Sequence, residues 1–235
     1  MKCVFCQSSF SKSLQLGEIF SLHQGIENSC CPTCFLEINR LDMTQGNHCQ
    51  YCKKQLIDQK RNDCGDCSRW GKELTQFDLN HSYLYEHNEK MKEYFKQFKF
   101  LGDIGMKDAF ALDIHLQLKS FQEEKFIIIP IPIAKKRMLD RGFNQVESFL
   151  DSSDISYERL LRKKKQTKRQ SELNREERLA TEQPFFVTKR SGKKIYQQQV
   201  LLVDDVYTTG RTILHAYECL KPYKPREICS FSITR

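Results

Sequence analysis

The sequence predicts an α/β protein in which a domain built on a parallel β-sheet follows a small cysteine-rich module. Residues 126–129 and 200–203 are continuously apolar and rich in β-branched side chains, as is typical of parallel strands buried on both faces. A loop and then a helical pattern follow each run. The third observation is that nine of the eleven cysteines precede Trp70. We therefore place the module in residues 1–75 and the α/β domain in residues 80–235.

The composition is that of a water-soluble chain with an excess of basic residues. Its 235 residues are enough for a full α/β core, and its formal net charge is +8. No apolar run approaches the roughly 20 residues that a membrane helix needs, and residues 1–6 lack the apolar core and cleavage site of a signal peptide. We therefore expect a cytoplasmic protein with reduced thiols, which reaches the inner face of the membrane only through partners.

Four Cys-x-x-Cys pairs predict two structural zinc sites in residues 1–75. Each pair places two thiolates on one ion, and two pairs complete a tetrahedral site. We expect pairing in sequence order, first with second and third with fourth, although the spacing also permits the second and third pairs to combine. A single bound metal and a set of disulfides are the alternatives, and the lack of a signal peptide disfavours disulfides. The predicted zinc ligands are Cys3, Cys6, Cys31, Cys34, Cys49, Cys52, Cys64 and Cys67.

Residues 82–118 predict a short strand and two core-facing helices. Residues 82–85 are the strand candidate, and apolar residues from Met91 to Phe98 then recur at positions i, i+3, i+4 and i+7 of a helix. This helix should end at Gly102, and residues 108–118 repeat the helical pattern. We expect the aromatic residues to pack in the core, whereas Lys99 is a candidate for a phosphate contact.

A cationic loop follows the predicted strand 126–129. Pro130 and Pro132 end the strand, because proline cannot donate a hydrogen bond to a neighbouring strand. A helix begins near Asn144, whose side chain can cap it. A cationic loop between a strand and a helix suits pyrophosphate, which needs several cations and N–H donors; the alternative is an ordinary charged turn. The candidate residues of this loop are Lys135, Lys136, Arg137, Arg141 and Gly142.

Residues 159–178 are the most basic part of the chain, with nine basic and three acidic residues. Residues 153–161, which overlap the start of this segment, predict a short strand, and residues 173–178 within it predict a short helix. The run 162–170 is too highly charged to pack in a core, so we expect a mobile arm that an anion orders. Nucleic-acid phosphates and a sugar pyrophosphate are the candidate anions. A further short strand is expected at 185–187, and a last strand at 227–234.

The stretch 200–212 combines a buried strand, two acids, a small hydroxylated loop and the start of a helix. Such a loop directs backbone N–H groups and the positive end of the helix dipole at one point, which suits a phosphate. Adjacent acids at the carboxyl end of the strand suit a diol or Mg²⁺. A sugar phosphate satisfies both requirements, whereas the alternative is an ordinary strand–turn–helix connection. The predicted contact residues are Asp204, Asp205, Val206, Tyr207, Thr208, Thr209, Gly210, Arg211 and Thr212.

This stretch resembles the loop that binds phosphoribosyl pyrophosphate (PRPP) in type I phosphoribosyltransferases. By that resemblance Asp204 and Asp205 face the ribose hydroxyls, residues 208–212 wrap the 5′-phosphate, and Mg²⁺ accompanies PRPP. The four cysteine pairs and five further motifs, taken in order, resemble the ComF (ComFC/GntX-like) family. These motifs are Phe98–Asp103, Pro130–Pro132, Arg141–Gln145, Thr167–Gln170 and Asp204–Gly210.

The family resemblance implies a double zinc ribbon joined to a phosphoribosyltransferase-like, Rossmann-like domain. It also implies a role in natural competence, in which the protein handles imported single-stranded DNA in the cytoplasm. A DNA-translocating helicase of the competence machinery (ComFA-like) is the implied protein partner, and no membrane insertion is implied.

Three functions are compatible with the sequence. The one we expect is a competence protein whose PRPP pocket accompanies DNA handling. The alternative is an active phosphoribosyltransferase for nucleotide salvage, in which Mg²⁺ and basic residues stabilise departing pyrophosphate while a nucleobase-like acceptor attacks the ribose. The third is a docking protein with a vestigial pocket. We expect PRPP binding, whereas turnover stays open because no residue identifies the acceptor.

Overall fold

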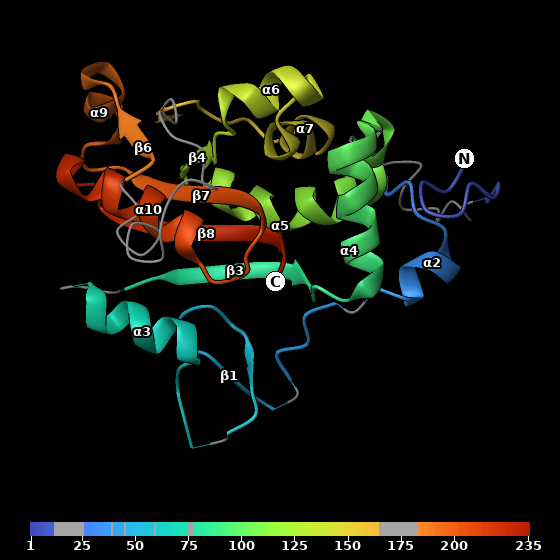
Figure 1. Cartoon of the computed structure of the whole chain (residues 1–235), viewed down its shortest axis with the longest axis horizontal. Helices are drawn as coiled ribbons and strands as arrows, with labels where there is room; N and C mark the ends of the chain where they lie inside the picture. The colour runs from blue at the N-terminus through green and yellow to red at the C-terminus, as the bar shows by residue number, and fades with distance from the viewer. Residues whose placement is uncertain (12–25, 39, 45, 59, 75–77, 165–182) are drawn as a thin grey trace, which may run out of the picture.

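A parallel four-stranded sheet lies at the centre of the computed structural model (Figure 1). The structure describes residues 1–11, 26–38, 40–44, 46–58, 60–74, 78–164 and 183–235. The strand order is β3 (Asn80–Tyr85), β8 (Glu227–Thr234), β7 (Gln199–Val206) and β4 (Ile127–Pro130), and each neighbouring pair is parallel. The predicted α/β fold with a parallel sheet is therefore confirmed.

The central strand β7 is buried on both faces because its side chains alternate between two hydrophobic clusters. Leu201 and Val203 belong to the cluster on one face, and Val200 and Leu202 belong to the cluster on the other. The strand is longer than the predicted 200–203 because its ladder with β8 continues to Val206. The two acids after the apolar run therefore belong to the strand.

Aromatic side chains fill the first cluster, as the spacing predicted. They come from α4 (Glu89–Lys96), the following π-helical turn η1 (Gln97–Leu101) and the 3₁₀ segment η2 (Ile104–Phe110), which leads into α5 (Ala111–Glu123). Helix α7 (Gln145–Ser152) completes this face, and Asn144 caps it as predicted. Tyr94, Phe98, Phe110 and Phe149 are all buried here, with ring centroids of neighbouring pairs 5.0–6.5 Å apart.

The second face is covered by α10 (Arg211–Leu220), α9 (Lys189–Ile195) and the 3₁₀ turn η4 (Lys221–Tyr223). A two-stranded antiparallel ribbon of β5 (Leu161–Lys163) and β6 (Phe185–Val187) packs beside them. The predicted strand 153–161 is wrong except for its last residue, because Ser153 ends α7 and the ladder begins only at Leu161. Residues 165–182, which include Thr167–Gln170 and the helix predicted at 173–178, lie outside the described residues.

The cationic segment after β4 is a helix, α6 (Lys135–Arg141), and not the loop that the sequence predicted. Its residues include Lys, Arg, Met and Leu, which are strong helix formers, and none of them is buried. A helix without an apolar face carries no periodic pattern that sequence analysis can detect. Gly142 ends it with a φ of 81°, in the left-handed region that glycine adopts at low cost.

The cysteine-rich module consists of α2 (Pro32–Leu36), the antiparallel pair β1 (Asn47–His48) and β2 (Gln55–Leu56), and α3 (Gly65–Glu73). Figure 1 shows α2 beside α4, and α3 with β1 beside the edge strand β3. Backbone hydrogen bonds from Leu41 to Leu84 and from His81 to Tyr51 join the module to β3. The predicted boundary between residues 75 and 80 stays a prediction, because residues 75–77 lie outside the described residues.

None of the helices in the described ranges combines the length and the apolar character that a membrane crossing requires.

Candidate functional site

A cleft of about 420 Å³ opens at the carboxyl ends of β4 and β7. This is the edge at which parallel α/β sheets bind ligands, because the loops that leave neighbouring strands diverge there. Five segments contribute to it: the turn before α4, α4 with η1, the segment from β4 through α6 to α7, β5, and the end of β7 with the loop and the start of α10 that follow it. The lining residues are His87, Lys92, Phe95, Lys96, Lys99, Ile131, Pro132, Ile133, Arg137, Arg141, Gln145, Val146, Lys163, Asp204, Asp205, Val206, Thr208 and Thr212.

Two carboxylates form the acidic wall of the cleft. Asp204 and Asp205 are adjacent, and the backbone N–H of Asp205 donates to Asp204 Oδ1 at 2.9 Å. Lys99 Nζ lies 2.8 Å from Asp205 Oδ2, in a pair whose side chains are only 21% and 16% exposed. Burial, reinforced by the charge of Asp205, raises the pKa of Asp204 to about 7. A bound cation would reverse that shift, because it stabilises the ionised carboxylate.

Basic side chains from four elements line the same cleft. Arg137 and Arg141 come from α6, Lys163 comes from β5, and Lys92 and Lys99 come from α4 and η1. Burial, followed by repulsion from Arg137, lowers the pKa of both Arg141 and Lys163. Positive charges that are partly desolvated and crowded together favour an anionic partner. The cleft therefore combines two carboxylates with several basic side chains.

The lysines of α4 and η1 were largely missed by the sequence analysis. Lys92, Lys96 and Lys99 follow one another at i, i+4 and i+7, which is the spacing of one helix face. This row of lysines lies beside the apolar face of the helix, and its spacing could have identified these residues from the sequence. Lys99 is also held over the ring of Phe95, with Nζ 4.7 Å from the ring centroid. Of the predicted basic residues, Arg137 and Arg141 line the cleft, whereas Lys135, Lys136 and Gly142 do not.

The loop after β7 is packed tightly over Tyr207, which is 2% exposed. Gly210 has a φ of 81°, and a Cβ atom there would lie 2.2 Å from Tyr207 Oη. The same glycine caps α10, whose N-terminus follows directly. Among the predicted loop residues, Asp204, Asp205, Val206, Thr208 and Thr212 line the cleft. Tyr207 instead lies beneath the loop, and Thr209, Gly210 and Arg211 do not line the cleft.

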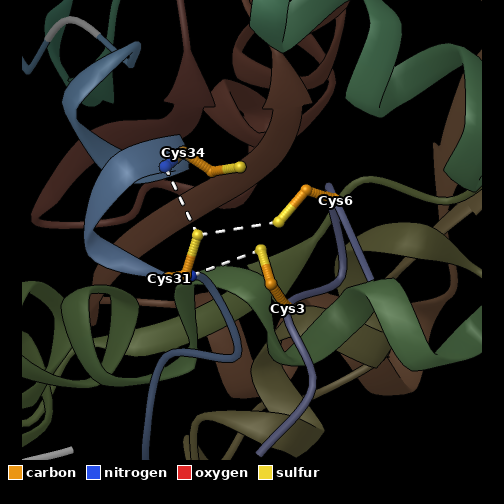
Figure 2. Close-up of side chains that lie close together, drawn as sticks. All are labelled: Cys3, Cys6, Cys31 and Cys34. Atoms are coloured by element: carbon orange, nitrogen blue, oxygen red, sulfur yellow. Dashed lines mark hydrogen bonds between the residues drawn. The ribbon is translucent and has the colours of Figure 1, made fainter. Parts of the chain in front are cut away.

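The first two cysteine pairs form one cluster of four sulfur atoms (Figure 2). Cys31 caps α2, and its Sγ lies 3.7 Å from Cys6 Sγ. The backbone N–H of Cys31 donates to Cys3 Sγ at 3.3 Å, and that of Cys34 donates to Cys31 Sγ at 3.5 Å. Burial raises the pKa of the neighbouring Cys30 to about 12, so this residue is a buried thiol beside the cluster.

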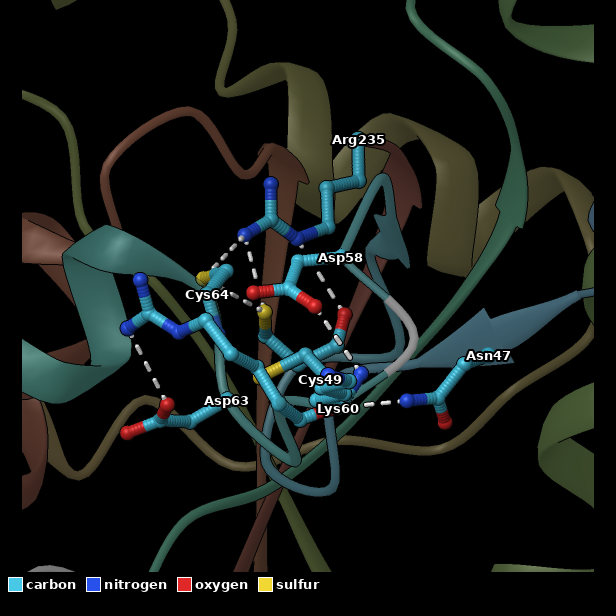
Figure 3. Close-up of polar contacts among 9 residues, drawn as sticks. Asn47, Cys49, Asp58, Lys60, Asp63, Cys64 and Arg235 are labelled. Atoms are coloured by element: carbon cyan, nitrogen blue, oxygen red, sulfur yellow. Dashed lines mark hydrogen bonds and ion pairs between the residues drawn. The ribbon is translucent and has the colours of Figure 1, made fainter.

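The third and fourth pairs form a second cluster, in which all four cysteines are buried. Cys52 Sγ and Cys64 Sγ lie 3.6 Å apart, and the N–H of Cys64 donates to Cys49 Sγ at 3.3 Å. Figure 3 shows the guanidinium of Arg235 directed at the sulfur of Cys64, at 3.8 Å, and its Nη2 lies 2.8 Å from Cys52 Sγ.

Both clusters fit zinc. Sulfur atoms in a tetrahedral site with Zn–S distances of about 2.3 Å lie about 3.8 Å apart. One sulfur pair in each cluster, at 3.7 and 3.6 Å, agrees with that spacing, and all sulfurs of a cluster lie within 4.8 Å of one another. The structure joins the first pair with the second and the third with the fourth, as predicted. The two clusters are able to hold one metal ion each.

The chain was also compared with known proteins. The model of the phosphoribosyl transferase domain matches residues 143–233, which include β7 and α10. The chain is 33% identical over 236 residues to competence protein ComFC of Streptococcus pneumoniae (strain ATCC BAA-255 / R6), with 100% of both chains covered. It is 29% identical to competence protein ComFC of Bacillus subtilis (strain 168), over 99% of this chain and 94% of the relative. Competence protein F of Haemophilus influenzae (strain ATCC 51907 / DSM 11121 / KW20 / Rd) is 22% identical over 89% and 91%.

Proposed function

The chain belongs to the ComFC family of competence proteins, and we propose that its cleft binds PRPP with Mg²⁺ while the protein handles imported single-stranded DNA in the cytoplasm. The competence-associated role follows from the family. The ligand and the nucleic acid are proposals that rest on the chemistry of the cleft and of its basic surroundings.

The observation that carries the PRPP proposal is that a pair of adjacent acids and several cations line one cleft. Asp204 and Asp205 supply the hard oxygen donors that Mg²⁺ takes from proteins, usually together with substrate phosphates and water. The same oxygens can accept hydrogen bonds from a ribose diol. Arg137, Arg141 and Lys163 are then suited to the pyrophosphate, because guanidinium groups form paired hydrogen bonds with phosphate oxygens.

The loop after the acids supports the position of the 5′-phosphate. Thr208 and Thr212 line the cleft and offer hydroxyl groups, and Gly210 places the N-terminus of α10 next to them. A helix N-terminus attracts anions through its unpaired N–H groups and its dipole. When bound, Mg²⁺ would neutralise charge on the pyrophosphate. The residues of the chain bind and orient the sugar phosphate.

Two structural zinc ions are part of the proposal. Each cluster offers four thiolates at the spacing of a tetrahedral site, and each belongs to a hydrophobic cluster of the sheet. The metal would therefore stabilise the protein core as well as the module.

The DNA proposal is supported by exposed cations around the cleft. Lys135 and Lys136 on α6 are exposed and lie next to the cleft residue Arg137. Each phosphate that such side chains neutralise releases counterions, so binding should weaken with salt. The partner is proposed to be a DNA-translocating helicase of the competence machinery.

Calorimetry with PRPP and Mg²⁺ tests the pocket. We expect the wild-type protein to bind and the double variant Asp204→Asn, Asp205→Asn to lose the binding, because it loses both the diol acceptors and the metal ligands. Asp78→Asn, Glu227→Gln is the matched control, since both acids lie at the other end of the sheet, beside a different cleft. Equal affinity of wild type and the site variant would overturn the assignment.

An active phosphoribosyltransferase is the second candidate function, and the domain match together with the paired acids favours it. Incubation with PRPP and a panel of bases, followed by a pyrophosphate assay, separates an enzyme from a binding protein. Release of pyrophosphate that depends on a base and on Asp204 would establish turnover.

A further inference from the structure

The loop 208–212 after β7, which we call the phosphate loop, is anchored to the second cysteine cluster through its backbone carbonyls. Trp70 Nε1 donates a hydrogen bond to the carbonyl oxygen of Thr209 at 2.8 Å. Trp70 lies on α3, the helix that begins after Cys64 and carries Cys67 in its first turn. Two ligand positions of the cluster therefore fix the start of the helix, and one turn later that helix holds a loop carbonyl.

Arg235 makes a second connection between the cluster and the loop. Its guanidinium donates from Nη2 to Cys52 Sγ at 2.8 Å and from Nε to Cys52 O at 3.1 Å. On its other side Nη1 approaches the carbonyl oxygen of Thr208 at 3.5 Å, and the group lies 4.7 Å from the ring centroid of Tyr207. The Arg235 backbone is itself fixed, because its N–H donates to Tyr85 O and its carbonyl accepts from His87.

These contacts dictate which way the loop peptides face. In a trans peptide the carbonyl and the N–H of the same unit point in opposite directions, and the described chain contains no cis peptide bond. Holding the carbonyls of Thr208 and Thr209 against the module turns the N–H groups of Thr209 and Gly210 away from it. Backbone N–H groups of such a loop and of the helix N-terminus that follows it form the anion sites of phosphate loops.

We propose that Trp70 and Arg235 are positioning residues that couple metal at Cys49, Cys52, Cys64 and Cys67 to anion binding by the loop 208–212. The coupling rests on the proposed function of the cleft. Four thiolates and one Zn²⁺ carry a net charge of about −2, which holds the Arg235 guanidinium in place. Without the metal, both the start of α3 and the electrostatic anchor of Arg235 are lost, and the loop carbonyls are released.

Calorimetry with PRPP and Mg²⁺ on the full-length, zinc-loaded protein tests this coupling. Trp70→Phe keeps an aromatic ring but removes the donor to Thr209, and we expect about three- to tenfold weaker binding with both zinc ions retained. Arg235→Gln should weaken binding at least as much, because it removes the contacts to Cys52, Tyr207 and Thr208 together. Arg226→Gln is the matched control, since Arg226 is exposed and lies beside the distant cleft before β8.

Zinc affinity supplies a readout that does not depend on turnover. Coupling between two sites is reciprocal, so saturating PRPP and Mg²⁺ should raise the zinc affinity of one of the two clusters in a competition with a chromogenic chelator. The increase should vanish in the double variant Trp70→Phe, Arg235→Gln. Arg235→Lys keeps the charge beside Cys52 but cannot reach Thr208 at the same time, so its PRPP affinity should be intermediate.

The outcomes separate the two proposals. If wild type binds PRPP and the Trp70 and Arg235 variants bind it equally well with unchanged zinc competition, the coupling is refuted and the cleft assignment stands. Full affinity of Arg235→Lys would show that charge alone acts and would overturn the orienting role of Arg235. If wild type does not bind PRPP, the function proposed for the cleft fails, and the coupling fails with it.

Discussion

Replacement of Gly210 by alanine tests how firmly the phosphate loop is held against Tyr207. Alanine at a φ of 81° costs about 1–2 kcal/mol, because its Cβ crowds the neighbouring carbonyl in the left-handed region. The new methyl group would also lie 2.2 Å from Tyr207 Oη and 2.6 Å from its Cζ. Overpacking of that kind costs about 1–3 kcal/mol. We therefore expect the free energy of unfolding to fall by about 2–5 kcal/mol if the loop keeps its shape.

The chain can instead relieve the clash by moving the loop. In that case the loss of stability is smaller, but the N–H groups of the loop change direction, and affinity for PRPP with Mg²⁺ falls by about tenfold for each 1.4 kcal/mol of lost interaction. Urea denaturation measures the first quantity, and calorimetry measures the second. Either stability or affinity must therefore change.

Two other glycines separate the contributions of strain and clash. Gly102 has a φ of 67° with no atom within 4 Å of a Cβ, so Gly102→Ala measures backbone strain alone. A Cβ at Gly192 would lie 2.2 Å from the Tyr223 ring, so Gly192→Ala measures the clash alone, without a positive φ. If Gly210→Ala lost no more stability than Gly102→Ala and bound PRPP with full affinity, the loop would not be held against Tyr207 as described.

Four further outcomes follow from the geometry. Since burial raises the pKa of Asp204 from 3.8 to about 7, the folded state holds that proton more tightly, so its contribution to stability falls between about pH 4 and 7. Over the same range, PRPP affinity in the presence of Mg²⁺ should rise by up to about tenfold per pH unit and then level off, because Asp204 becomes ionised. Calorimetry on Asp204→Asn should show a PRPP affinity that depends less on pH. Lys99→Met should move the midpoint above pH 7, because the charge of Lys99 holds the pKa of Asp204 down; an unchanged midpoint would count against the ion pair with Asp205. Chelation of zinc should lower the melting temperature of the whole protein in circular dichroism, since each cysteine cluster belongs to the hydrophobic cluster on one face of the sheet, and a sheet transition at an unmoved temperature would contradict this. Tyr85→Phe should cost about 1–3 kcal/mol in urea denaturation, because it removes the hydrogen bond to the buried carboxylate of Asp113, and a loss below 0.5 kcal/mol, on the order of a surface change, would argue against that bond.

The strands and the paired acids were predictable because their signals are local. The apolar run at 200–203 is typical of a central strand buried on both faces, and the strand predicted at 227–234 matches β8. The cysteine pairs were equally local, and their order of pairing follows the order of the sequence. The helix α6 was missed because a helix with no buried residue shows no apolar periodicity.

Trp70 and Arg235, which hold the carbonyls of the loop 208–212, had no comparable signal in the sequence. Trp70 and Thr209 are 139 positions apart, and Arg235 and Cys52 are 183 apart. Nothing in the residues flanking Trp70 or Arg235 distinguishes them from ordinary surface side chains. Trp70 and Arg235 reach the loop after β7 only in the folded chain, so their role could not be inferred before the topology was known.

The order of the strands also bears on how the protein is made. Strand β3 pairs with β8, and His81 in β3 lies 149 positions before its partner Ser230. On the ribosome β3 therefore emerges long before the strand that covers its edge, and an uncovered edge strand invites aggregation. All eight cysteines of the two clusters precede β3, and seven of them belong to the hydrophobic clusters on the two faces of the sheet. Metal uptake during synthesis can thus organise the surroundings of β3 while the rest of the sheet is still being translated, so the zinc supply of the cell should affect the yield of folded protein.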